Sequence, residues 1–217
     1  MLLAAACAAL VIAISPTADV SPTLVARVID EANAIWTPAG VTLVVQQDGV
    51  PSPALAVVIG PERGTAHAYD APIGWIEFDD GRPQPRLYLS LTNARVLFES
   101  ARGVVGLAAQ MPILERETYL GRALGRALAH ELGHYLLAAK THTAAGLMKA
   151  NFTAAELFLP NLAHFAIAAD QQAIARARLD QASLVAAATS GSSSPTSRPP
   201  ASPPRAAARW RAPTPRS

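Results

Sequence analysis

Apolar residues follow two different spacings in the first part of the chain. Over residues 21–36 they recur at positions 24, 25, 28, 29, 32, 35 and 36, which is the spacing of one face of a helix. Ser21 suits the cap of this helix and Pro22 its first position, so we expect the helix to begin there. The TPAG segment at 37–40 ends the pattern, and the apolar runs 41–46 and 54–60 predict two strands. A helix alternating with strands indicates an α/β or α+β body.

The next part of the chain is first turn-rich and then helical. Further short strands are expected at 65–69, 74–78 and 86–91. The sequence DDGRP between the last two has the residues of a hairpin turn. Helical spacing returns over 92–101 and, for longer, over 116–139. Thr153 and Glu156 form a capping box that predicts another helix, interrupted at Pro160 and continuing to about residue 179.

The chain opens with an apolar run that ends at Ser15 and is too short for a bilayer span. Small residues at Ala13 and Ser15 suit a signal peptidase, and Ala18 offers a second cut. No Lys or Arg precedes the run, so either the start codon is placed too late or the segment is an apolar N-terminal strand. We favour a signal peptide at 1–18, which predicts a secreted or periplasmic protein with no stable membrane insertion after signal removal. Cys7, the single cysteine, would leave with it.

The last part of the chain, 183–217, is rich in Ser, Pro and Arg and holds almost no large apolar side chains. Such a composition cannot repay the entropy of ordering, so we expect a disordered tail after a domain at 19–182. The net charge of +2 depends on five arginines of this tail, and the rest of the chain is mildly acidic. The charge distribution therefore gives no support to nucleic-acid binding.

Three of the five histidines lie in the segment HELGHYLLAAKTH, from His130 to His142. On a helix, residues four apart share a face, so His130 and His134 can hold one metal ion together. Glu131 is turned away from the ligand direction but can reach a water molecule bound to that ion. A third ligand from His142 would complete a three-ligand catalytic site with an open fourth position. The alternative is an ordinary helix whose histidines have no common role.

The segment HELGHYLLAAKTHTAAGLM resembles the active-site region of the metzincin zinc peptidases, and AHAYDAPIGWIEFDD at 66–80 resembles the strand region of their matrixin-like members. The resemblance implies an α+β fold, with a small mixed twisted sheet, an N-terminal helix, a long active-site helix and a C-terminal helix. It also implies that His130, His134 and His142 bind one catalytic zinc ion. Glu131 would be the general base, and Met148 would lie in the methionine-bearing turn beneath the metal.

Two features depart from the family pattern HExxHxxGxxH. Leu137 stands where the pattern has glycine, and His142 follows His134 by eight residues instead of six. The two extra residues could extend the helix by about half a turn, with Lys140 and Thr141 forming the exit. Glu156 is the competing third ligand, because other zinc peptidases use a distant glutamate. Its place in the capping box already gives it a structural role.

Other residues near these segments have simpler interpretations. His67 matches a position that binds a structural zinc in matrixins, but Glu77 stands where the resemblance would place a histidine. We therefore expect His67 to be a surface or strand residue. His164 lies in an apolar helix and is expected to be a hydrogen-bonded core residue. Trp75 would be core or cleft wall, and Tyr135 would pack on the helix.

The function implied by the resemblance is hydrolysis of peptide bonds by a zinc-bound water, without a covalent intermediate. The partner would be an extended peptide or protein substrate, lying along an edge strand at 64–70 or 74–78. Two other hypotheses stay open. The chain could be a secreted zinc-containing peptide-binding module without catalysis, or a plain secreted domain without metal. The sequence leaves the oligomeric state open.

Overall fold

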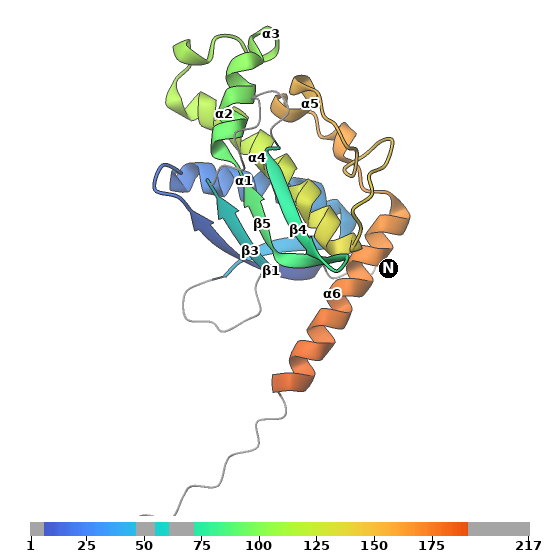
Figure 1. Cartoon of the computed structure of the whole chain (residues 1–217). Coiled ribbons are helices and arrows are strands. Elements are labelled where there is room, and N and C mark those ends of the chain that lie inside the picture. Colours follow the sequence, from blue (N-terminus) through green and yellow to red (C-terminus); the bar gives the residue numbers. More distant parts are fainter. Residues whose placement is uncertain (1–6, 47–54, 61–71, 191–217) are drawn as a thin grey trace, which may run out of the picture.

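The computed structural model describes residues 7–46, 55–60 and 72–190, with side chains as far as residue 184. Within these ranges five strands form one sheet in the order β2-β1-β3-β5-β4 (Figure 1). In chain order they are β1 (Ala8–Pro16), β2 (Val41–Val45), β3 (Leu55–Ile59), β4 (Gly74–Asp79) and β5 (Arg82–Leu89). All neighbours are parallel except β4, which pairs with β5 in the antiparallel direction as an outer strand. The prediction of a mixed sheet is confirmed.

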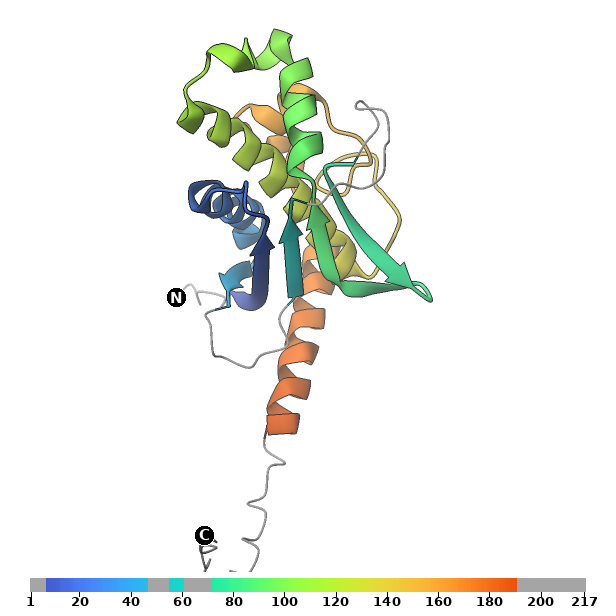
Figure 2. The ribbon, with the colours of Figure 1, turned by 60° about the vertical axis from the view of Figure 1, so that its left-hand side comes forward.

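The described chain has three long helices, α1, α4 and α6, and three shorter ones. The six α-helices are α1 (Pro22–Trp36), α2 (Leu91–Ser100), α3 (Arg102–Val105), α4 (Ile113–Leu137), α5 (Ala154–Phe158) and α6 (Ala169–Ser190). Helices α1 and α4 pack side by side against the sheet, α1 next to β2 and α4 next to β4 and β5 (Figures 1 and 2). Short 3-10 turns lie at Thr37–Ala39, Ala108–Gln110 and Ala163–Phe165. The predicted N-terminal helix and long central helix are both present.

The apolar face expected for α1 is the face that it buries. Ser21 caps the helix by accepting a hydrogen bond from the Leu24 N–H group at 3.0 Å, and Pro22 occupies the first position. Trp36, at the other end, is fully buried and donates its indole N–H to the Ala129 carbonyl oxygen of α4 at 3.0 Å. A buried indole that keeps its hydrogen bond fixes the two helices against each other. This contact places the second half of α4, which carries the histidines.

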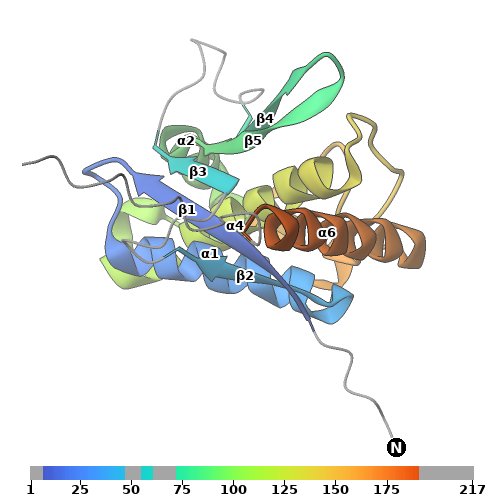
Figure 3. The ribbon, with the colours of Figure 1, turned by 90° about the horizontal axis from the view of Figure 1, so that it is seen from below.

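The apolar segment at the start of the chain is a strand inside the sheet. Ala8–Ile12 pair with β2, and Ile12–Pro16 pair with β3, so β1 lies between these two strands (Figure 3). Leu10 and Ile12 are buried in the core. In the structure, residues 8–16 form the strand that was one of the two interpretations of this segment. Cleavage of a signal peptide and export of the protein stay predictions.

Other boundaries also differ from the prediction. The strand expected at 86–91 begins earlier, at Arg82, and the strand expected at 65–69 lies outside the described residues. After Pro160 the chain does not resume one helix. It passes through the turn Ala163–Phe165 before α6, and α6 continues to Ser190, beyond the predicted tail boundary at 183. Residues 191–217 lie outside the described chain. None of the helices that the structure describes is both long and apolar enough to span a membrane.

Candidate metal centre

The last turns of α4 carry His130 and His134 on one face, as their spacing predicts. Their Nε2 atoms lie 3.1 Å apart. His130 and His134 are both buried. His142 comes from the loop after the helix, and its ring centroid lies 5.3 Å from that of His130 and 4.9 Å from that of His134. One ligand atom from each of the three rings falls within 4.8 Å of the others. The three predicted ligands are therefore brought together.

The chain reaches His142 by ending the helix, not by extending it. Helix α4 stops at Leu137, and Ala138 takes a left-handed conformation with φ 50°. A left-handed residue at this position is a usual way to end a helix, although glycine is the residue that most often takes it. The two extra residues of the spacing thus belong to the exit loop. The expectation that they add about half a helical turn is wrong.

Backbone carbonyl groups fix the orientation of the two helical histidines. The Nδ1 atom of His130 lies 2.8 Å from the Leu147 carbonyl oxygen, and Nδ1 of His134 lies 2.6 Å from the Ala139 carbonyl oxygen. A carbonyl oxygen only accepts, so each Nδ1 carries the proton and donates it. Each Nε2 is then left with a free lone pair. These hydrogen bonds fix the tautomer and the orientation of both rings, so the two unprotonated Nε2 atoms face each other.

Burial keeps these rings in the neutral form that binds metals. It lowers the pKa of His130 from its ordinary 6.5 to about 4, mainly through desolvation of the charged form. The pKa of His134 is lowered for the same principal reason. At neutral pH two uncharged Nε2 lone pairs therefore face each other at 3.1 Å. Two acceptors at this distance repel unless a cation lies between them, so the donor set fits a metal ion.

A tight turn under the helix supplies the carbonyl group that holds His130. The Thr143 N–H donates to the Met148 carbonyl oxygen at 2.8 Å, and Gly146 has φ 80°, a conformation that favours glycine. The Leu147 N–H donates to the Ala166 carbonyl oxygen at 3.0 Å, which ties the turn to the chain before α6. Met148 is only 2% exposed, and its sulfur packs against Gly133, between the two helical ligands.

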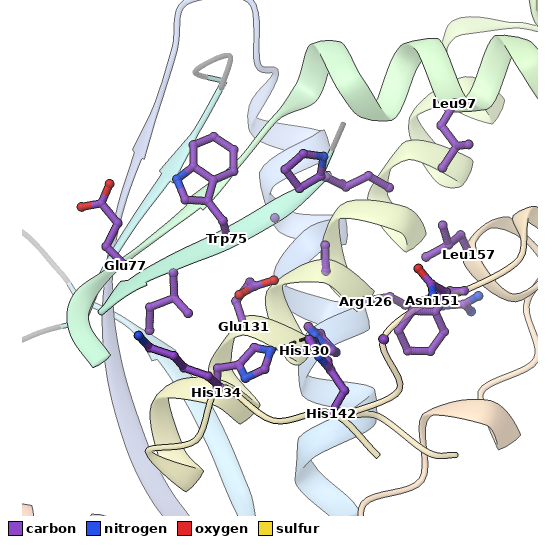
Figure 4. A pocket seen from close by; sticks show the side chains of 18 of the residues that line it. Trp75, Glu77, Leu97, Arg126, His130, Glu131, His134, His142, Asn151 and Leu157 are labelled. Atoms are coloured by element: carbon purple, nitrogen blue, oxygen red, sulfur yellow. Dashed lines mark hydrogen bonds between the residues drawn. The ribbon is translucent and has the colours of Figure 1, made fainter. Parts of the chain in front are cut away.

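The three histidines open onto a cleft of about 940 Å³. Strand β4 lines one side of it with Trp75 and its neighbours, α4 forms the floor, and residues 150–152 with Leu157 line the opposite side (Figure 4). Trp75 stacks on Tyr88 of β5 with centroids 5.1 Å apart, so its ring packs against the neighbouring strand. The prediction that Trp75 is core or cleft wall is confirmed.

Glu131 lies in the cleft between the histidines and strand β4. Its side chain points to the same open side of α4 as the histidine rings (Figure 4). Glu131 is 7% exposed, and its Cγ atom would lie 3.1 Å from a Cβ atom on Gly74. The absence of a side chain at Gly74 therefore leaves room for this carboxylate. A buried carboxylate beside a metal-binding group can exchange a proton with a molecule in the cleft.

Glu156, the competing third ligand, has other partners. Its carboxylate receives hydrogen bonds from Lys149 Nζ at 2.6 Å and from the Thr153 N–H at 2.8 Å. Lys149 and the Thr153 backbone lower the pKa of Glu156 to about 2. Glu156 does not line the cleft of the three histidines. The predicted capping box is present, and this structural role accounts for the residue.

The other residues considered in the sequence analysis are His164, Tyr135, His67 and Glu77. The side chain of His164 is 54% exposed, 3.4 Å from Glu156, so the prediction of a core residue is wrong. It stands in a short 3-10 turn instead of an apolar helix. Tyr135 packs on the helix as expected, with Arg178 over its ring. His67 lies outside the described residues. Glu77 lines the cleft on β4.

Two basic residues of the cleft were not found from the sequence. Arg126, one helical turn before His130, is 1% exposed and donates from Nε to Glu31 at 2.7 Å. Its spacing of four from His130 was the signal that it shares the cleft face. Lys140 lies with Nζ 4.9 Å from the centroid of Phe78. It joins the exit loop to β4 by a contact that no local pattern predicts.

No protein-family model matches this chain, and no curated protein matches it in a sequence search.

Proposed function

We propose that the chain is a zinc-dependent endopeptidase. The observation that carries the proposal is the convergence of three imidazole ligand atoms within 4.8 Å at the floor of a cleft, beside a buried glutamate. Three neutral nitrogen ligands with one side open to a cleft are typical of catalytic zinc sites, whereas structural zinc sites have four protein ligands. The resemblance to metzincins at 130–148 supports zinc over other metals that imidazole binds.

His130, His134 and His142 would hold the ion. When bound there, zinc supplies Lewis acidity, which polarises a peptide carbonyl group and acidifies water. Glu131 accepts the proton of the attacking water and returns it to the leaving amine nitrogen. The carbonyl groups of Leu147 and Ala139 keep two imidazoles in the required tautomer throughout. No covalent bond to the protein forms in this scheme.

Strand β4 is the surface on which a peptide substrate would lie. It is the outer strand of the sheet, paired with β5 on one side, and its residues 74–78 line the cleft. An extended peptide can add to such an edge through main-chain hydrogen bonds. The register shifts between Ile76 and Phe78, so the edge is irregular beside Glu77. We assign the substrate to 74–78, because these residues line the cleft of the three histidines. The other candidate edge, 64–70, lies outside the described residues.

The test uses protein purified without a histidine tag. We expect one zinc per chain by elemental analysis and cleavage of casein or a peptide panel. Glu131→Gln should lower kcat/KM by about 10²–10⁴-fold and retain the zinc, because Glu131 is the base and not a ligand. Glu115→Gln, which changes an exposed carboxylate in the first turn of the same helix and away from the cleft, is the matched control and should retain activity.

One observation favours a second function. His142 is exposed, unlike the two helical ligands, and it follows a longer loop than the family pattern has. A zinc-containing peptide-binding module without catalysis is therefore the alternative. One equivalent of zinc together with peptide binding but no cleavage would favour it, and protein without zinc would refute both functions.

A further inference from the structure

Strand β4 begins with Gly74, a glycine that its backbone conformation does not require. It is not among the described glycines with the positive φ that favours this residue, which are Gly40, Gly60, Gly81, Gly106 and Gly146. In a strand, glycine is a weak choice, because it has no side chain to pack and more conformational freedom to lose. The surroundings of Gly74 give a different reason for a glycine at this position.

The space beside Gly74 is enclosed on three sides. A Cβ atom on residue 74 would lie 3.1 Å from Cγ of Glu131, 3.3 Å from Cβ of Ala127 and 3.3 Å from Cδ2 of Leu89. Carbon atoms in ordinary contact lie about 3.5–4.0 Å apart, so an alanine at this position would force at least one neighbour to move. We call this space the Glu131 slot, because the Glu131 side chain lies on its cleft side.

Of the three neighbours, Glu131 is the one that can give way. Leu89 is fully buried on β5 and pairs directly with Gly74 in the sheet. The Cβ atom of Ala127 is bonded to the backbone of α4, which the Trp36 hydrogen bond holds against α1 two residues further on. Glu131 lines the cleft, and rotation about its side-chain bonds moves its Cγ atom into that open volume. A methyl group at residue 74 would therefore displace the glutamate and leave the rest of the slot in place.

We propose that Gly74 is a positioning residue for the general base: the Glu131 slot, left by its missing side chain, holds the carboxylate beside the histidines. The effect on the reaction rests on the proposed peptidase function, whereas the slot itself does not. Gly74 acts through Glu131, because its absent Cβ would face α4 and β5 and not the peptide edge of β4. A misplacement of 1 Å can cost about 10²-fold in rate, so a shift of a few tenths of an ångström should lower kcat by roughly 3- to 10-fold.

The activity test compares Gly74→Ala in two backgrounds. In the zinc-loaded parent it should lower kcat by roughly 3- to 10-fold with KM nearly unchanged, since Glu131 acts in the transition state and not in peptide binding. In Glu131→Gln, which already lacks the base, the same change should lower the residual kcat no further. Gly103→Ala is the matched control, because a Cβ atom there meets no other atom within 4 Å, and it should keep the parent kcat. Equal losses of kcat in the two backgrounds would overturn the proposal.

A stability test without zinc or substrate separates this proposal from the proposed function. Urea unfolding of the metal-free protein measures the effect of Gly74→Ala in the parent and in Glu131→Ala, which has no Cγ atom. The change should lower the midpoint urea concentration of the parent, and lower it less, or raise it, in Glu131→Ala. Equal shifts overturn the proposal, whereas unequal shifts in a protein that cleaves no peptide support the slot and refute the peptidase. If Gly74→Ala does not fold, the double variant decides: it should fold, and its failure to fold overturns the proposal.

Discussion

The sulfur of Met148 packs directly against Gly133, at a place where a Cβ atom on residue 133 would collide with it. Gly133 stands between the two helical ligands, and Met148 follows the carbonyl group that holds His130. We therefore expect Gly133→Ala to push the turn away from α4 and to destabilise the fold by about 1–3 kcal/mol, as overpacking does. Denaturant unfolding measures the stability, and competition with a chelator measures the zinc affinity, which should also fall.

The sign of this effect is what makes it informative. In an ordinary helix, replacing glycine with alanine stabilises by roughly 0.5–1 kcal/mol. Gly103→Ala in α3 is the matched control, since a Cβ atom there meets no other atom within 4 Å. It should be neutral or stabilising. A Gly133→Ala protein with unchanged stability and zinc affinity would show that Met148 does not support the site.

Replacing His142 tests the ligand that the sequence placed least firmly. His142→Ala should reduce zinc affinity by ~100-fold or more, because it removes one of three ligands. The fold should change little, since His142 is exposed. Zinc affinity is measured by chelator competition and the fold by circular dichroism.

Glu156→Gln provides the comparison with the competing ligand. It removes the negative charge next to Lys149 and weakens the capping box, so stability should fall by about 1 kcal/mol. Zinc affinity should not change, because Glu156 does not line the cleft. Loss of zinc from Glu156→Gln, with zinc retained by His142→Ala, would show that Glu156 and not His142 is the third ligand.

Local sequence patterns were sufficient for α1, for α4 and for the shared face of His130 and His134. The spacing of His130 and His134 fixes a common face on any helix, and the cap at Ser21 fixes the start of α1. The position of His142 could not be predicted from local patterns alone. The left-handed conformation of Ala138 and the contact of Lys140 with Phe78 both direct the exit loop. Neither has a local sequence signal.

For the N-terminal segment, the local sequence could not decide between two interpretations. A strand that is inside a parallel sheet is a short continuous apolar run, and so is the core of a signal peptide. Composition cannot separate them. The difference lies in pairing with β2 and β3, whose residues are distant in the sequence. In the same way, the partners of Arg126 come from α1 and α5 and were beyond a local pattern.

The metal-free protein should lose stability in mildly acidic solution. The folded-state pKa of His130 is about 4, below its ordinary 6.5. Between these values the unfolded chain binds a proton that the folded chain does not, so the free energy of unfolding falls as pH decreases from 6.5 to 4. The slope from this group reaches at most about 1.4 kcal/mol per pH unit. His134 acts in the same direction.

Urea unfolding of chelator-treated protein across this pH range measures the effect. His130→Gln should show a smaller slope above pH 4.5. Below pH 4.5, Glu156 adds a separate loss, because its depressed pKa of about 2 gives stability that disappears as the carboxylate is protonated. Glu156→Gln should remove only this lower part. Equal slopes for His130→Gln and the parent chain would contradict the burial of a neutral His130.

Removing the first eighteen residues should prevent folding, because β1 is the strand between β2 and β3. Without it, β2 loses its pairing to the rest of the sheet, β3 keeps only its pairing with β5, and the core loses Leu10 and Ile12. A chain that starts at Asp19 should therefore lack a cooperative unfolding transition. Ile12→Asn gives a milder version and should destabilise by several kcal/mol, of the order found for core truncations, since Ile12 is fully buried.

Ala9→Asn, at an exposed position of the same strand, is the control and should be tolerated. A second measurement tests whether this segment is removed in cells. Mass spectrometry of the N-terminal peptide should find residues 8–16 in the folded protein. A folded, zinc-containing protein that begins at Asp19 would show that β1 is dispensable, and it would support the predicted signal peptide.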